Sequence, residues 1–229
     1  MMKVLSLGLL VASICAVAAC DDDGRVDPPL ADGPTGCDPA TILPSNYRPI
    51  PNVATGMVNV TTTGGITSGT IDATAGGSMN SADNPYIYVD LKMGAKVAIN
   101  DLDARSSTAW DIALKRPSLR VNGGDSGGGG RKLAVVQAAT LAEVMTAPTS
   151  GYEVDDFADA NCMLITGLIG NPMSAFGEWY NYNMATHEVT PKSEVYVLEH
   201  PDGSRTALRI IGYATGGTTA LYGVEWKQL

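Results

Sequence analysis

The sequence predicts an all-β fold: a single antiparallel β domain, with short helices in its loops, over residues 51–229. Three observations predict it. From about Ile50 onward the chain is rich in Gly, Thr, Val and Tyr. Short apolar alternations recur between turn residues, as in successive strands. Their spacing leaves little room for the crossover helices that a parallel sheet needs.

Six segments carry the clearest strand pattern. They are residues 86–91, 110–114, 133–137, 195–199, 207–213 and 222–226. His200, Pro201, Asp202 and Gly203 join the fourth strand to the fifth, and because Pro fixes φ while Gly accepts a positive φ, these strands form a hairpin. Helix is expected only around residues 140–145 and 156–161.

The N-terminus has the plan of a secretory signal. Lys3 precedes an apolar run over residues 4–19, and no further charge appears before Asp21. The run is shorter than the roughly twenty residues of a membrane-spanning helix and ends in VAAC, which resembles a lipobox. We therefore expect residues 1–19 to be a lipoprotein signal peptide and Cys20 to be the lipidated mature N-terminus. The alternative is an ordinary signal cut after an alanine.

We expect residues 20–50, which begin with Cys20, to form an acidic, disordered tether. Five aspartates between residues 21 and 32 face only Arg25, among prolines and glycines, which is typical of a solvated segment. Loss of the signal would change the formal net charge from −9 to −10, so no nucleic-acid partner is expected.

Two cysteines remain for the folded part, because Cys15 leaves with the signal and Cys20 carries lipid. Two leftover cysteines in an exported chain favour one disulfide, between Cys37 and Cys162. Metal binding by this pair is disfavoured, since neither a CxxC motif nor a nearby histidine supports it.

The segment Gly124-Asp125-Ser126-Gly127-Gly128 matches the surroundings of nucleophilic serines in hydrolases. A chymotrypsin-like enzyme needs its histidine upstream, whereas His187 and His200 both lie downstream. An α/β-hydrolase needs a helix after the serine, and the glycines up to Gly130 do not start one. The same run lacks the Gly-Lys-Ser/Thr ending of a phosphate loop. We therefore interpret it as a long glycine turn and expect no enzyme.

Short motifs in the second half of the chain resemble HmuY-type proteins in order and spacing. They are Trp110-Asp111-Ile112-Ala113-Leu114, Arg116, Arg120 to Gly124, Trp179-Tyr180-Asn181-Tyr182, Thr186-His187, Thr190-Pro191, Val195 to Leu198, Asp202-Gly203 and Leu208-Arg209-Ile210. The resemblance covers roughly residues 85–229. It implies an all-β, haem-binding lipoprotein of the outer membrane or cell surface, which captures haem and passes it to an outer-membrane receptor.

The resemblance also implies axial haem ligands from two loops, as His or Met. Met145 and Met173 fall at roughly those places, in turn-rich loops. A thioether is a soft, neutral ligand that needs no deprotonation before it binds iron. The structural alternative is that both methionines fill gaps under the loops.

His187 is the rival ligand, because it lies near the aromatic residues Trp179, Tyr180 and Tyr182. These rings suit a hydrophobic core as well as a haem wall. We expect His200, in its hairpin turn, to be exposed to solvent. Two other functions stay open: a structural or adhesion lipoprotein of the same fold without haem ligands, and a secreted hydrolase that uses Ser126.

Overall fold

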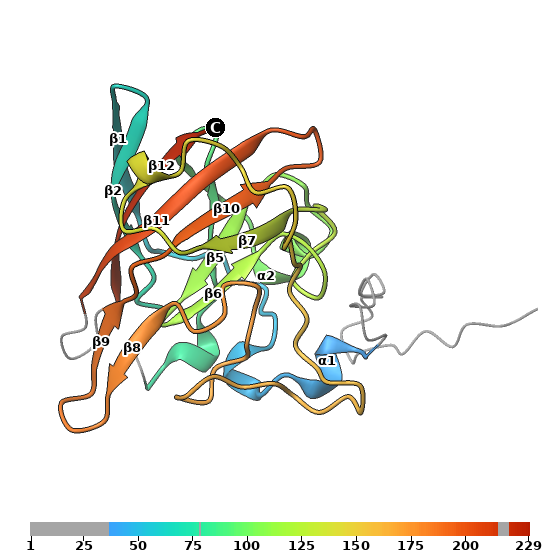
Figure 1. The fold of residues 1–229 in the computed structure, drawn as a ribbon. Coiled ribbons are helices and arrows are strands. Elements are labelled where there is room, and N and C mark those ends of the chain that lie inside the picture. The colour runs from blue at the N-terminus through green and yellow to red at the C-terminus, as the bar shows by residue number, and fades with distance from the viewer. Residues whose placement is uncertain (1–36, 78, 215–219) are drawn as a thin grey trace, which may run out of the picture.

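The computed structural model describes residues 37–77, 79–214 and 220–229. Two antiparallel sheets and a separate hairpin make up this part of the chain, and its helices are short connections (Figure 1). The predicted all-β class is confirmed. The predicted signal peptide and Cys20 lie outside the described residues.

A six-stranded sheet forms one layer. In spatial order its strands are β1 (Val58–Thr63), β2 (Ile66–Asp72), β12 (Leu221–Gln228), β11 (Arg205–Ala214), β10 (Val195–Glu199) and β7 (Lys132–Val136). The predicted hairpin is present, with Glu199 paired to Arg205 across its turn. The register between β11 and β12 shifts after Ile210, which marks a β-bulge.

A four-stranded sheet forms the second layer, in the order β4 (Ala95–Val97), β3 (Ile87–Asp90), β5 (Ile112–Lys115) and β6 (Ser118–Val121). The separate hairpin pairs β8 (Tyr180–Asn183) with β9 (Glu188–Pro191). The helices are α1 (Pro39–Ile42), α2 (Asp101–Ala104), and the 3₁₀ turns η1 (Ser45–Tyr47), η2 (Ser81–Asp83) and η3 (Leu141–Glu143). None of the helices in these described ranges is long and apolar enough to cross a membrane.

One of the two predicted helices is wrong. The helix expected at residues 140–145 exists as the single turn η3. Residues 156–161 are not helical, because the carboxylate of Asp159 accepts the backbone N–H groups of Asn161 and Met163. Such local side-chain bonds offer the backbone an alternative to a helix.

The main core lies between the two sheets. Alternate residues of each strand point into it, so Ile112 and Leu114 of β5 are core residues, while Ala113 and Lys115 face the other side of their sheet. Trp179 is 1% exposed and packs against Tyr213 and Tyr222, so this aromatic cluster belongs to the core.

The glycine run 123–130 is a buried turn organised by Asn122. The Asn122 amide donates to the carbonyls of Ser107 and Trp110, and its Oδ1 accepts the N–H of Gly129. A Cβ on Gly127 would lie 2.4 Å from Asn122 Oδ1. Gly127 and Gly129 of the predicted glycine turn therefore have a steric cause, since the chain there passes too close to Asn122 for side chains.

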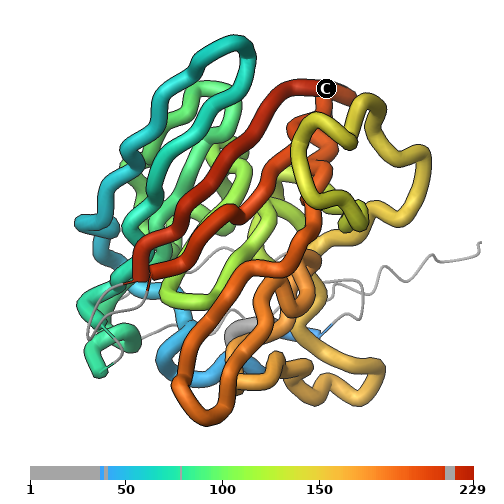
Figure 2. The backbone as a smooth tube through the Cα atoms, turned by 60° about the vertical axis from the view of Figure 1, so that its left-hand side comes forward, coloured from blue at the N-terminus to red at the C-terminus, as the bar shows by residue number. Residues whose placement is uncertain are grey.

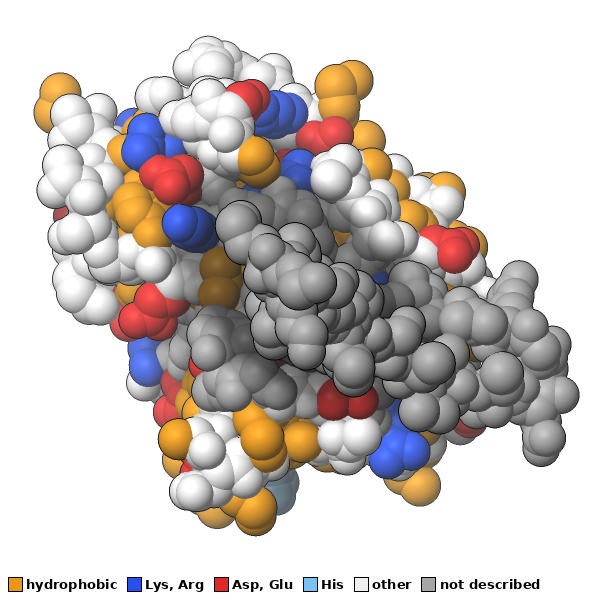
Figure 3. Space-filling model, turned by 90° about the vertical axis from the view of Figure 1, so that its right-hand side faces the viewer, with side chains coloured by type: hydrophobic (Ala, Val, Ile, Leu, Met, Phe, Trp, Pro, Cys, Tyr) orange, Lys and Arg blue, Asp and Glu red, His pale blue; other side chains and the backbone are white. Residues whose placement is uncertain are grey.

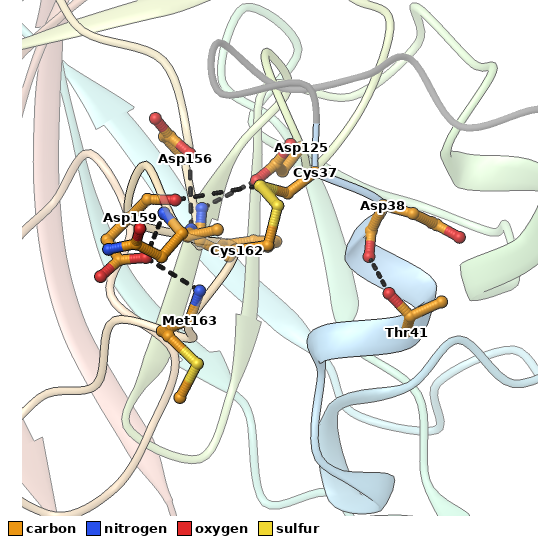
Figure 4. Close-up of a disulfide and its surroundings, with 11 residues drawn as sticks. Cys37, Asp38, Thr41, Asp125, Asp156, Asp159, Cys162 and Met163 are labelled. Carbon is orange, nitrogen blue, oxygen red and sulfur yellow. Dashed lines mark hydrogen bonds between the residues drawn. A yellow bond between two sulfur atoms is a disulfide. The ribbon is translucent and has the colours of Figure 1, made fainter.

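Cys37 and Cys162 form a disulfide with their Cα atoms 5.4 Å apart, as predicted (Figure 4). It joins the start of the described chain to a loop ahead of β8. Figures 1 and 2 show the N-terminal segment (blue) beside this orange loop at the lower end of the molecule. Residues 37–50 belong to the segment predicted to be a disordered tether. In the structure, however, Leu43 is buried and the Ile50 carbonyl accepts the N–H of Asp101.

Candidate functional site

A pocket of about 310 Å³ lies where η1, η2, the β5–β6 turn, the β8–β9 hairpin and the end of β11 meet. It is partly open to solvent. Three tyrosines, three cationic or titratable side chains and small polar or apolar residues line it: Tyr47, Tyr182, Tyr213, Lys115, Arg116, His187, Asn46, Ser81, Pro117, Ile169 and Val189. The predicted candidate His187 is therefore part of a pocket, together with residues from five other parts of the fold.

His187 is held in the pocket wall by its hairpin. It occupies the left-handed region with φ 57°, and its N–H closes the turn on the carbonyl of Asn183. The Tyr182 hydroxyl is 2.6 Å from His187 Nδ1. An imidazole whose one nitrogen is fixed by a hydrogen bond presents the other, here Nε2, to a metal ion.

Backbone strain coincides with this pocket. Four described residues other than glycine have a positive φ, and two of them, Arg116 (φ 52°) and His187, line the pocket. Each such residue costs of order 1–3 kcal/mol and persists only where the surroundings impose it. Two core side chains hold Arg116 in this conformation. Tyr222 Oη donates a hydrogen bond to the Arg116 carbonyl, and Trp179 Nε1 donates one to the carbonyl of Pro117.

An apolar loop, residues 163–173, borders the pocket through Ile169. Met163 is 65% exposed and Leu168 66% exposed, while Asn171 anchors the loop to β8 by accepting a hydrogen bond from Tyr180 Oη. Burial raises the pKa of Tyr180 to about 12, so this hydroxyl stays a donor at neutral pH. Figure 3 shows hydrophobic side chains gathered around a histidine at the lower end of the molecule.

The structure separates the two predicted methionine ligands. Met173 is half-buried in the apolar loop, where its N–H donates to the carbonyl of Ile165. Met145 is 84% exposed and follows η3, which packs on the outer face of the six-stranded sheet against Val197 and Ala207. Figure 1 shows the yellow turn that contains η3 toward the upper end of the molecule and the light-orange apolar loop at its lower end.

The exposure of Met145 does not single it out as a ligand. Five other methionines are exposed as well: Met57, Met79, Met93, Met163 and Met184. Neither Met145 nor Met173 lines the pocket. Only the loop of Met173 comes near His187.

The predicted exposure of His200 is wrong. Its side chain is 3% exposed, with Nε2 2.9 Å from Thr206 Oγ1 and Nδ1 3.3 Å from Asp111 Oδ1. Burial of Asp111 would raise its pKa, but His200, the Leu91 N–H and Arg131 together lower it, so the carboxylate is charged. His200 therefore ties its hairpin to Asp111, the residue that precedes β5.

Ser126 is a buried structural residue. Its Oγ donates to Asp155 Oδ2 over 2.5 Å, and Asp155 also accepts the N–H groups of Val121 and Ala175. No described hydrogen bond joins Ser126 to either histidine. The hydrolase-like motif thus connects the glycine turn to the segment that leads into β8.

Lys115 was not among the predicted site residues. It follows the apolar residues of β5 and is 1% exposed. The signal was a lysine continuing the Trp110–Leu114 strand pattern, but the residues of η1 that line the same pocket belong to the segment predicted to be tether.

Comparison with known proteins agrees with this architecture. The family model described as HmuY protein matches residues 82–226, more than half of the chain. This chain belongs to the HmuY family. A comparison with curated proteins gave no match. The matched HmuY region contains most of the pocket, whereas Asn46, Tyr47 and Ser81 precede it.

Solved structures share the HmuY-like fold at low identity. A putative lipoprotein of Bacteroides fragilis has a TM-score of 0.51 at 16% identity, covering 75% of this chain and 95% of its own. A putative HmuY-like heme-binding protein of Bacteroides vulgatus has a TM-score of 0.46 at 19% identity, covering 70% and 91%. The apo HmuY analogue of Tannerella forsythia has a TM-score of 0.48 at 15% identity, covering 75% and 98%.

Proposed function

We propose that this protein is a hemophore-like envelope lipoprotein, which captures haem for iron acquisition and passes it to an outer-membrane receptor. It performs no reaction on the haem. Membership of the HmuY family supports this function. The observation that carries it is His187, an imidazole fixed by Tyr182 in the wall of a pocket next to an exposed apolar loop.

The donor set fits haem. Haem capture needs an axial ligand, apolar contact for the porphyrin and polar groups near its propionates. His187 Nε2 supplies the ligand, and the apolar loop with Tyr182 and Tyr213 supplies contact area. At about 310 Å³ the pocket is at the lower end of the range for ligand sites, so it would hold one edge of the porphyrin and leave the rest on the apolar loop.

We propose His187 as the first axial ligand and Met173 as the second. Met173 belongs to the loop that borders the pocket, so a shift of that loop would bring its thioether toward the iron. Met145 would need a much larger movement, because η3 lies toward the upper end of the molecule, away from the apolar loop at its lower end (Figure 1).

An optical titration with hemin, in oxidised and reduced states, tests the proposal. The parent should shift the Soret band and give a low-spin spectrum. His187→Gly should weaken binding by more than about tenfold, because the ligand is lost while glycine readily keeps the positive φ. Met173→Ala should give a weaker, five-coordinate complex.

Met184→Ala is the matched control for Met173→Ala. Met184 is 76% exposed in the β8–β9 turn that also contains His187, and its variant should behave like the parent. If Met145→Ala abolishes the spectrum and His187→Gly does not, the ligand assignment is wrong but haem binding stands. If the parent shifts no Soret band in either state, a structural or adhesion lipoprotein replaces the proposal.

A further inference from the structure

Lys115 carries a buried positive charge with no described hydrogen-bond partner. It is the last residue of β5, is 1% exposed, and lines the pocket described above. Among the described residues nothing accepts a hydrogen bond from its Nζ. A buried ammonium without acceptors destabilises a fold, so such a residue needs another explanation than stability.

The charges around Lys115 leave it unsatisfied. Asp101 and Asp83 attract it and Arg120 repels it, while its Nζ lies 5.5 Å from the centre of the Tyr86 ring. The Asp101 carboxylate is already used by the N–H of Tyr86 and the hydroxyl of Tyr88. Burial is the largest influence and lowers the pKa of Lys115 to about 8, so the side chain still carries most of its charge at neutral pH.

The next residue of the turn is also cationic. Arg116 directly follows Lys115 and keeps a strained positive φ, although glycine would be relaxed there. Both residues line the pocket. Two successive cations at the pocket, one buried without an acceptor and one in a strained turn, favour an anionic ligand group.

We propose that Lys115 binds a carboxylate of the pocket's ligand, which for haem is a propionate. This inference rests on the proposed function, and it adds the group by which the protein recognises the porphyrin. The flexible four-carbon side chain of Lys115 lets its Nζ rotate toward a carboxylate at the pocket wall. Iron ligation and carboxylate binding would then hold the haem at two separate points.

Binding of hemin and of hemin dimethyl ester to the full mature chain tests the inference. The ester keeps the iron and the ring but has no carboxylates. The parent should bind hemin at least about tenfold more tightly than the ester, the size of effect expected for a charge-assisted hydrogen bond. This comparison needs no variant.

Lys115→Met should bind hemin only as tightly as the ester, should bind the ester as the parent does, and should unfold at a higher temperature, because a buried charge is removed. A merely structural lysine would not change the ratio of hemin to ester. Lys132→Met is the control, since it removes the same charge from an exposed position on β7 and should keep the parent's ratio.

Equal binding of hemin and ester by the parent would overturn the role of Lys115 and leave haem binding intact. A ratio unchanged in Lys115→Met would do the same. If the parent binds neither porphyrin, the proposed function itself fails, and the inference fails with it.

Discussion

Single buried polar residues hold the parts of this chain that lack regular structure. Asp111, Asn122 and Asp155 each accept or donate several hydrogen bonds to segments distant in sequence, and buried His200 lies 3.3 Å from Asp111. Most of these residues belong to the HmuY-like motifs or to the glycine turn, in which functional residues were sought. Their partners are mainly backbone groups of turns, so at this scale the motifs specify how loops attach to the sheets.

The titration of Asp155 gives the first prediction. Asp155 is fully buried, which raises its pKa to about 7 despite hydrogen bonds from Ser126, Ala175 and Val121. Between about pH 4 and pH 7 the folded state then binds more protons than the unfolded state, so the free energy of unfolding should fall by roughly 2–4 kcal/mol as pH rises through this window. Urea unfolding at several pH values measures the slope.

Asp155→Asn should remove most of this pH dependence. The variant should also be about 1–3 kcal/mol less stable than the parent at pH 5, because one of the N–H donors loses its acceptor. A variant that keeps the parent's slope would show that another group titrates in this window.

At the scale of elements, the sequence predicts strands whose alternation is strong. The strands β10, β11 and β12 fall at the predicted places within one or two residues at most boundaries. It misses β1 and β2, because β1 buries no residue fully and an edge strand rich in Thr shows little alternation. The spatial order of the strands within the two sheets also could not be predicted, since it depends on pairings between strands that are distant in sequence.

The site was predictable in part. His187 was found because histidine is rare in this chain and lies next to aromatic residues. The exposure of His200 was misjudged because its burial depends on Asp111, far away in sequence. Lys115 was missed because a lysine at the end of a strand pattern is usually exposed, and the pocket it lines includes Asn46 and Tyr47 from the segment predicted to be tether.

The glycine turn gives the second prediction. Gly129→Ala should lower the free energy of unfolding by about 1–3 kcal/mol, because a Cβ there would lie 2.4 Å from Asn122 side-chain atoms. Gly128→Ala is the matched control, since its nearest neighbour, the Arg105 carbonyl oxygen, would be 3.7 Å away. Chemical denaturation measures both. Equal stabilities would show that the turn yields to side chains and does not depend on Asn122.

At the scale of the whole molecule, the disulfide closes a loop with a sequence separation of 125 residues. Replacing both Cys37 and Cys162 by Ala should lower the free energy of unfolding by roughly 2–5 kcal/mol, because the unfolded chain gains freedom. Calorimetry of the variant beside the reduced parent checks this, and the two should agree. An unchanged melting temperature would show that the contacts of residues 37–50 suffice without the bond.

Lipidation of Cys20 gives the last prediction. Cys20→Ala should release the protein from membranes and abolish labelling by a radioactive fatty acid, because the thioether to the lipid cannot form. Fractionation of cells that produce the parent and the variant measures this. Persistent anchoring with label intact would show that the lipid is attached elsewhere.

If Cys20 carries the proposed lipid, the disulfide also limits how far the domain can lie from the membrane. With Cys37 bonded to the body, the sixteen residues 21–36 separate it from Cys20, and a fully extended chain of that length spans at most about 60 Å. A domain anchored in this way would be confined to a thin layer above the lipid surface. Within such a layer, the local concentration of the domain near a partner in the same membrane depends on the length of residues 21–36. That length would therefore set the rate of encounter, and so of ligand transfer, independently of affinity.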